Sequence, residues 1–203
     1  MIFCYAKCGD KYLGEMENFI QDPNQADLMK TADRCIEHKL FNAAKILYQK
    51  SGNNQKLAVV YVMLKQYGLA LEAARKADIP KVWKQVCFAC VRAQEFKSAT
   101  SCGLNIIIHP DHLEDLINFY EKFGYYKELI GLLEQGLSHE RTHNGICTDL
   151  GIMYAKYQPG SLMDHINNYY HKLHIPKLIR ACEQFQMWPE AVALHQRYDQ
   201  WDN

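Results

Sequence analysis

Apolar residues recur at intervals of three and four along most of this chain, with polar residues between them. Leu57, Val60, Tyr61 and Leu64 show this spacing in one typical stretch. An α-helix with one buried face has this period, whereas a half-buried strand alternates every two residues. The one β-like run, residues 104–108, is short and ends beside a histidine-proline pair, so we interpret it as a frayed helix end. The pattern therefore predicts an all-α fold.

Brief turn signals separate the helical stretches. They contain proline, glycine, asparagine or aspartate and lie at residues 51–54, 77–80, 109–111, 158–160 and 174–176. Helices of about 10 to 15 residues with joints this short must fold back on one another.

The turns belong to a longer internal period. An aromatic residue follows a polar or turn segment six times, in steps of 26, 29, 30, 31 and 31 residues, at Phe41, Tyr67, Phe96, Tyr126, Tyr157 and Trp188. Residues at fixed distances from these aromatics are small or apolar. Three positions after them stand Ala44, Ala70, Ala99, Leu129, Gly160 and Ala191. Six positions after them stand Leu47, Ala73, Cys102, Leu132, Met163 and Leu194. Six positions before them stand Cys35, Tyr61, Cys90, Tyr120, Gly151 and Cys182.

This period predicts a helical hairpin repeated about every 30 residues, whose second helix begins at the aromatic. The expected hairpins are residues 25–50, 54–77, 80–108, 111–138, 140–172 and 175–200, and residues 1–21 are the tail of an earlier one. Pro80, Pro110 and Pro176 fall where first helices should begin, because proline is tolerated in a first turn. A hairpin cannot bury its apolar face alone, so we expect residues 1–203 to form one continuous α-solenoid of about six hairpins.

The composition is that of an ordinary folded chain. Of the 203 residues, 48% are hydrophobic and 23% are charged. No stretch approaches the 18 or so apolar residues of a membrane-spanning helix, and the first residues lack the apolar region of a secretory signal. We therefore expect a cytoplasmic protein with no direct membrane insertion, whose eight scattered cysteines are reduced.

The charge balances overall but is unevenly distributed. Lysine and arginine equal aspartate and glutamate at 23 each, which gives no reason to expect nucleic acid as a partner. Residues 1–100 hold 15 basic and 10 acidic side chains, whereas residues 101–203 hold 8 and 13. The two halves therefore carry formal charges of about +5 and −5.

One short motif suggests a metal site. Residues 139–143, HERTH, match the zinc-protease template H-E-x-x-H, in which two histidines share a helix face and the glutamate activates a metal-bound water. The extended template needs glycine at 146 and histidine at 149, but the chain has Ile146 and Asp149. Asp149 is the one candidate for a third ligand to join His139 and His143. We interpret the motif as a chance match and expect no metal.

Other reactive residues have structural interpretations. The C-x-x-C pair at residues 87–90 has no second pair to complete a zinc site, so we expect buried helix packing. The pairs His109 with His112 and His171 with His174 flank turns, where solvated or capping roles are expected. The sequence contains no phosphate-binding loop, dinucleotide fingerprint or nucleophile elbow, so we expect neither an enzyme nor a cofactor.

Several stretches carry a resemblance to a known family. They are DRCIEHKLFNAAKILY (33–48), ARKADIPKVWKQVCFACV (74–91), EFKSATSCGLNIII (95–108), HERTHNGICTDLGIMYAKY (139–157) and HIPKLIRACEQ (174–184). In order and without large gaps, they resemble the clathrin heavy-chain family in its proximal-leg region. That family typically reads L-E-R-A-H where this chain has HERTH, so His139 is a departure that creates the zinc template.

The resemblance implies a structural role in the clathrin coat. It implies an α-solenoid that forms part of one leg of a three-legged assembly unit, packs against other heavy-chain legs and binds the clathrin light chain. Such units form cages on the cytoplasmic face of coated pits and coated vesicles, in endocytosis and intracellular protein transport. The family's N-terminal propeller and C-terminal trimerisation segment are not in this sequence, so we expect a fragment of a longer leg.

Charge suggests where partners would bind. A basic cluster is a candidate surface for an acidic light-chain helix: Arg75, Lys76, Lys81, Lys84, Arg92 and Lys97. Its alternative is a set of ordinary solvated side chains. If each leg has a basic half and an acidic half, two legs that lie antiparallel would also attract each other. Salt screens this attraction beyond about 8 Å. The rival functions are a peptide-binding solenoid of the tetratricopeptide kind and, through HERTH, a zinc metalloprotease.

Overall fold

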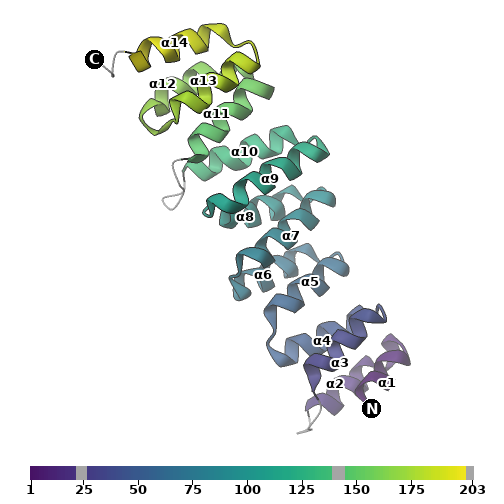
Figure 1. Cartoon of the computed structure of the whole chain (residues 1–203). Helices are drawn as coiled ribbons and strands as arrows, with labels where there is room; N and C mark the ends of the chain where they lie inside the picture. The colour runs from purple at the N-terminus through teal and green to yellow at the C-terminus, as the bar shows by residue number, and fades with distance from the viewer. Residues whose placement is uncertain (22–26, 139–144, 200–203) are drawn as a thin grey trace. The chain divides into compact units, whose positions relative to one another are not determined.

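The computed structural model describes residues 1–21, 27–138 and 145–199. Within these ranges all regular structure is helical, with fourteen α-helices and three short 3-10 helices and no strand. Successive helices pair as hairpins (Figure 1), which confirms the predicted all-α fold of repeated helical hairpins. The suspected β-like run is the end of a helix, because α8 extends to Ile106 and a turn follows.

Contacts divide the chain into two compact units, Met1–Cys102 and Gly103–Asn203, with the boundary inside α8. The first unit contains α1 (Ile2–Lys7), η1 (Asp10–Tyr12), α2 (Leu13–Gln21), α3 (Leu28–Glu37), α4 (Phe41–Ser51), α5 (Asn54–Met63), α6 (Tyr67–Ala77), α7 (Pro80–Arg92) and most of α8 (Phe96–Ile106). The hairpins here are the first (α3 and α4), the second (α5 and α6) and the third (α7 and α8).

The second unit continues the same pattern. It contains α9 (Pro110–Phe123), α10 (Tyr126–Leu137), α11 (Gly145–Tyr157), η2 (Pro159–Ser161), α12 (Leu162–Tyr169), η3 (Tyr170–Lys172), α13 (Ile175–Gln184) and α14 (Trp188–Asp199). These helices form the fourth (α9 and α10), fifth (α11 and α12) and sixth (α13 and α14) hairpins. Proline lies in the first turn of α7, α9 and α13, as the sequence predicts.

The turn inside a hairpin repeats one backbone conformation. Two residues before the aromatic, the chain is left-handed at Lys39, Lys65, Gln94, Gly124 and Gln186, with φ between 58° and 76°. The next residue donates its N–H to the carbonyl six positions before the aromatic. These bonds are Leu40 to Cys35 (2.8 Å), Gln66 to Tyr61 (2.9 Å), Glu95 to Cys90 (2.9 Å), Tyr125 to Tyr120 (3.1 Å) and Met187 to Cys182 (2.8 Å). This is the Schellman arrangement, which satisfies carbonyls that a helix end would leave unpaired.

The fifth hairpin departs from the pattern. The aromatics of the other five hairpins begin second helices, but Tyr157 is the last residue of α11, and α12 begins at Leu162. The reason is Pro159, which lacks an N–H and disfavours helical backbone at Gln158, where φ is −143°. The expectation that Tyr157 opens a helix is therefore wrong. In α12, Leu162 is buried and Met163 is only half-buried.

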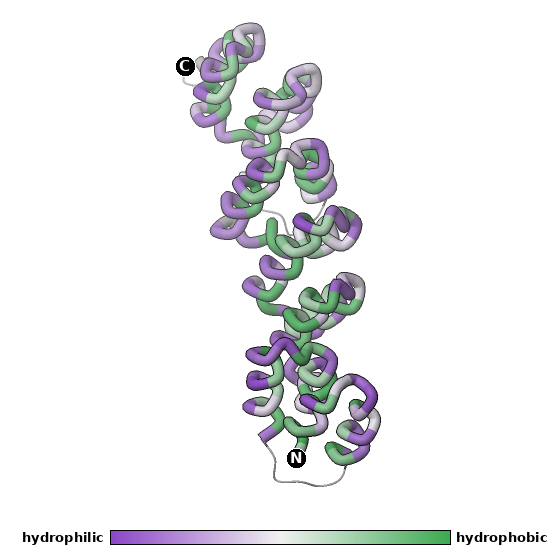
Figure 2. Tube along the Cα trace, turned by 90° about the vertical axis from the view of Figure 1, so that its right-hand side faces the viewer, coloured by the Kyte–Doolittle hydropathy of each residue, from purple (hydrophilic) through white to green (hydrophobic). Residues whose placement is uncertain are grey.

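The core of each hairpin lies between its two helices. The residues six before and six after the aromatic are at most 7% exposed in every hairpin except the fifth: Cys35, Leu47, Tyr61, Ala73, Cys90, Cys102, Tyr120, Leu132, Cys182 and Leu194. Figure 2 shows hydrophobic and hydrophilic residues alternating along the helices, as one buried face requires. Together these ten residues form the buried seam between the two helices of each of these hairpins. Burying one leucine side chain stabilises the fold by about 1.5 to 3 kcal/mol, so the buried seam is a major source of stability.

Alanine substitutions at two glycines of the fourth hairpin test the effect of backbone conformation on stability, because neither substitution changes the packing. At Gly124 φ is +76°, whereas Gly131 lies inside α10, and an added Cβ would meet no atom within 4 Å at either position. Gly124→Ala should lower the free energy of unfolding by about 1 kcal/mol, because alanine is strained in the left-handed region. Gly131→Ala should raise it by up to about 1 kcal/mol, because alanine favours helix. Urea unfolding measures both, and equal effects of one sign would contradict the assigned turn.

Candidate functional site

The six residues of the basic cluster lie on three consecutive helices. Arg75 and Lys76 end α6, Lys81 and Lys84 lie in the first turns of α7, Arg92 ends α7, and Lys97 begins α8. Five of the side chains are exposed and that of Lys84 is half-buried. The structure therefore places all six in the first unit, at or near the protein surface.

Helix α7 has a buried face and a basic face. Its buried residues are Val82, Trp83, Val86, Cys87, Cys90 and Val91. Lys81, Lys84, Phe88 and Arg92 follow one another at spacings of three and four, which places them on a shared face. Lys84 Nζ lies 5.7 Å from the Phe88 ring centroid. Lys81 and Arg92 are about 16 Å apart along the helix axis, so this face could follow about three turns of a bound helix.

Acidic residues near the cluster are fewer than basic ones. Between residues 71 and 100, Glu72, Asp78 and Glu95 are the only carboxylates, against six basic side chains. Asp78 accepts a hydrogen bond from the Trp83 indole at 3.4 Å. The local excess of positive charge suits an acidic partner, and electrostatic complementarity of this kind raises association rates and specificity.

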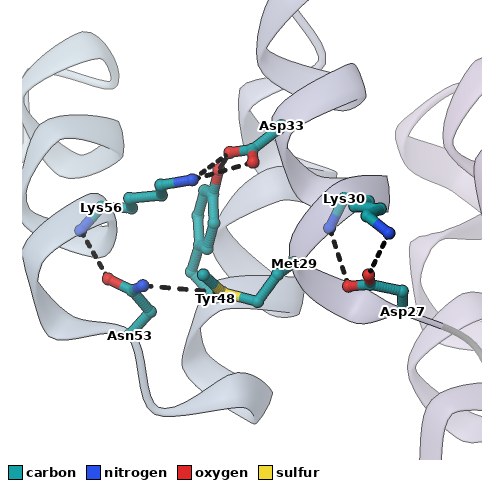
Figure 3. A network of polar contacts seen from close by, with 7 residues as sticks. All are labelled: Asp27, Met29, Lys30, Asp33, Tyr48, Asn53 and Lys56. Atoms are coloured by element: carbon teal, nitrogen blue, oxygen red, sulfur yellow. Dashed lines mark hydrogen bonds and ion pairs between the residues drawn. The ribbon is translucent and has the colours of Figure 1, made fainter.

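A second polar feature ties the first hairpin to α5 (Figure 3). The buried Tyr48 donates its hydroxyl to Asp33 Oδ1 at 2.5 Å, and Lys56 Nζ lies 2.6 and 2.8 Å from the two oxygens of the same carboxylate. The hydrogen bonds from Lys56 and Tyr48 hold the pKa of Asp33 below its ordinary value. Asn53 caps α5 by accepting from the Lys56 N–H at 3.0 Å. These contacts join α3, α4 and α5 and are structural.

A third polar feature is buried in the fifth hairpin. His165 is 5% exposed, and its Nε2 lies 2.8 Å from the Cys147 carbonyl, so Nε2 carries the proton. Its ring meets Tyr154 edge-on at 5.3 Å, and the Tyr154 hydroxyl donates to Glu134 at 2.6 Å. Burial lowers the pKa of His165 because the charged ring would lose its hydration. The sequence pattern did not predict this cluster, because His165, Tyr154 and Glu134 do not occupy the positions that recur from hairpin to hairpin.

The suspected zinc motif, His139, Glu140 and His143, lies outside the described residues. Asp149, the candidate third ligand, pairs with Lys177 at 2.7 Å. Across the residues that the structure describes, no three histidine, cysteine or acidic side chains are grouped so that they could hold a metal ion. In the same ranges, no helix is both long and apolar enough to cross a membrane.

The buried cysteines and His174 have the surroundings expected for packing and capping. Six cysteines are buried and only Cys4 and Cys8 are exposed, all as free thiols. His174 caps α13, because its Nδ1 accepts from the Lys177 N–H at 3.3 Å. His109 occupies the cap position of α9 without a side-chain bond to it.

Comparison with known proteins gives one consistent family. Residues 1–98 and 104–203 match the family model described as "Region in Clathrin and VPS". The chain is similar to the clathrin heavy chain of Drosophila melanogaster (44% identical), clathrin heavy chain 1 of Oryza sativa subsp. japonica (50%) and clathrin heavy chain 2 of Homo sapiens (42%). Each match covers all 203 residues of this chain and 12% of the relative's length.

The Asp33 contacts predict an acid-sensitive contribution to stability. Because the pKa of Asp33 is lowered in the folded state, its contribution is present above the ordinary value of 3.8 and is lost as pH falls below it. Asp33→Asn should destabilise the protein at neutral pH by at most about 1 kcal/mol, since the pair is partly exposed. The difference from the parent should shrink near about pH 3. Glu37→Gln, on the same helix, should show no such pH-dependent difference.

His165 predicts a second pH effect at milder acidity. Its folded pKa lies below the ordinary value of 6.5, so the unfolded chain binds a proton first and stability is lost as pH falls below about 6.5. His165→Gln should lower the free energy of unfolding by about 1 to 3 kcal/mol at about pH 8 and reduce its fall toward about pH 5.5. The exposed His38 provides the control, His38→Gln. An unchanged pH dependence in His165→Gln would contradict the buried neutral histidine.

Proposed function

Because the chain belongs to the clathrin heavy-chain family, we propose that it is a leg segment of a clathrin coat, which packs against other heavy-chain legs and binds a clathrin light chain. The observation that carries the proposal is 42 to 50% identity to clathrin heavy chains over the whole chain. The helical hairpins agree with it, since stacked hairpins offer extended surfaces for other proteins. The family is structural, which argues against a zinc protease built on HERTH.

The proposed segment is one continuous α-solenoid over residues 1–203. Support comes from the repeated turn at Lys39, Lys65, Gln94, Gly124 and Gln186, which closes hairpins of one design in both units. Hairpins with the same turn can stack by the same contacts, and a scaffold built this way offers an extended surface for other proteins. We place this scaffold on the cytoplasmic side of coated pits and coated vesicles, as the family implies, where it would act in vesicle transport.

The proposed light-chain contact is the basic face of α7 with its neighbours on α6 and α8. Exposed Lys81 and Arg92 mark its two ends, and Lys84 and Phe88 lie between them. An acidic amphipathic helix laid along this face could pair carboxylates with the cations and pack apolar residues on Phe88. Packing between legs would use the opposite charges of the two halves of the sequence, and salt should weaken both contacts.

A peptide-binding adaptor is the second candidate. In the second unit, a groove of about 560 Å³ is lined by Leu113, Ile117, Ile152 and Met153, with Glu114, Asp149 and Lys177 among the polar residues. Such a groove could hold a short peptide with apolar anchors. Family membership favours the coat scaffold, and binding confined to this groove would favour the adaptor.

Charge reversal tests the light-chain contact. The variant Lys81→Glu, Lys84→Glu, Lys97→Glu should weaken binding of a purified clathrin light chain by about 10-fold or more at physiological salt. The reason is that three attractive contacts become repulsive. The salt dependence of the dissociation constant should become shallower, which isothermal titration at several salt concentrations measures.

A matched control carries the same change of charge elsewhere. Lys50, Lys122 and Lys127 are exposed and lie outside the basic cluster, so their reversal to glutamate should leave light-chain affinity within about twofold. Circular dichroism confirms that both variants fold. Equal affinity and an equal salt slope for the parent and the cluster variant would eliminate the basic cluster as the contact surface.

A further inference from the structure

The groove of about 560 Å³ in the second unit lies between the first helices of the fourth and fifth hairpins. The apolar residues that line it are Leu113 and Ile117 from α9, and Ile152 and Met153 from α11. Leu113 and Met153 are buried, whereas Ile117 and Ile152 are half-buried and leave apolar surface within reach of a ligand. Because α11 lines the groove from Gly145 to Met153, the groove follows that helix for about 12 Å, or about two turns.

Two lysines beside this groove are already paired with carboxylates. Lys177 of α13 lines the groove, and its Nζ lies 2.7 Å from Asp149 Oδ1. About one helical turn beyond Ile152, Lys156 Nζ lies 2.8 Å from Glu121 Oε1 and joins α11 to α9. Each lysine is therefore neutralised by its partner and adds little net positive charge to the groove.

The rim of the groove that α9 forms is acidic. Between residues 111 and 121 the chain has no lysine or arginine but four carboxylates, Asp111, Glu114, Asp115 and Glu121. Glu114 lines the groove and is exposed, and among the residues that the structure describes it has no ion-pair partner. An unpaired carboxylate beside apolar surface is complementary to a ligand that carries a cation next to apolar side chains.

We propose that this groove binds a short basic amphipathic helix of a partner protein. Apolar side chains at positions i, i+3 and i+4 of that helix fill the groove between α9 and α11, and a neighbouring lysine or arginine pairs with Glu114. The length of the groove matches about two turns of such a helix. The proposal goes beyond the light-chain contact and does not depend on it, because it concerns another surface and a partner of the opposite charge.

The charge of the groove also selects against an acidic helix. Such a helix would bring its carboxylates toward Glu114, while Lys177 is already occupied by Asp149. Only a few ligand side chains fit into a groove of this size, so the dissociation constant for the basic helix should be micromolar or weaker. The two kinds of helix should therefore differ in affinity even when their apolar faces are identical.

The experiment titrates the full chain into a fluorescein-labelled helical peptide of about 15 residues and measures fluorescence anisotropy. The peptide carries leucines on one face and lysines beside them, and a matched peptide carries glutamates in place of the lysines. The basic peptide should bind at least about 10-fold more tightly than the acidic one, and added salt should weaken its binding. Equal affinity for the two peptides, or no saturable binding of the basic one, would overturn the proposal.

Variants of the chain test the two parts of the groove separately. Glu114→Gln should weaken binding of the basic peptide by about two- to fivefold, because an exposed ion pair contributes modestly, and Glu114→Lys by about 10-fold or more. Ile152→Ser removes apolar surface and should weaken both peptides alike. Asp164→Asn removes an exposed carboxylate of α12 outside the groove and should leave the affinity within about twofold. Unchanged binding in Glu114→Lys would contradict the proposed pairing.

Cross-linking of the unaltered chain decides the matter even where a variant fails to fold. A benzophenone group on the apolar face of the basic peptide should attach to α9 or α11, which peptide mass spectrometry identifies. Attachment confined to the first unit would overturn the proposal. The same conclusion would follow if the chain alone formed a dimer in sedimentation and Ile152→Ser dissociated it, because the groove would then be an interface between two copies of the chain.

Discussion

The buried seam between the two helices of a hairpin is the constraint on which the rest of this structure depends. The residues that form it, such as Leu47, Cys90 and Leu132, are almost fully removed from water. The turn that brings the helices together is held by a left-handed residue and by a backbone bond to a seam residue, as in Glu95 to Cys90. Burial and turn geometry therefore specify the same pairing, and this agreement between local and tertiary preferences favours a single fold.

The buried seam also determines where charged and polar side chains lie. Apolar residues fill the space between helices, so charged residues such as Lys81 and Arg92 are left on outer faces, where they can meet another protein. Buried tyrosine hydroxyls are hydrogen-bonded to carboxylates, as Tyr48 is to Asp33 and Tyr154 is to Glu134. This architecture agrees with the coat scaffold proposed for this chain, because stacked hairpins offer extended surfaces for contact with other proteins.

The fifth hairpin shows how the repeat tolerates a proline between its two helices. Pro159 delays the second helix, and Tyr157 stays at the end of α11, where its ring stacks on Tyr126 at 3.9 Å. Its hydroxyl also donates to Glu121 at 2.9 Å. Tyr157 therefore still packs against a neighbouring helix, although it does not begin the second helix of its hairpin. His165 occupies the interior of the same hairpin, where burial lowers the pKa of its ring and favours the neutral form.

The sequence by itself determined the helices, their turns and most of their buried positions, because these depend on local signals: spacing of apolar residues, proline in first turns and a repeated aromatic. It also placed the basic cluster, whose residues lie close together along the chain. Only the tertiary structure decided that Lys56 reaches Asp33 and that His165 is buried against Tyr154. Those contacts join residues 23 and 11 positions apart on different helices. Their existence depends on side-chain direction and helix packing, which no periodicity in the sequence encodes.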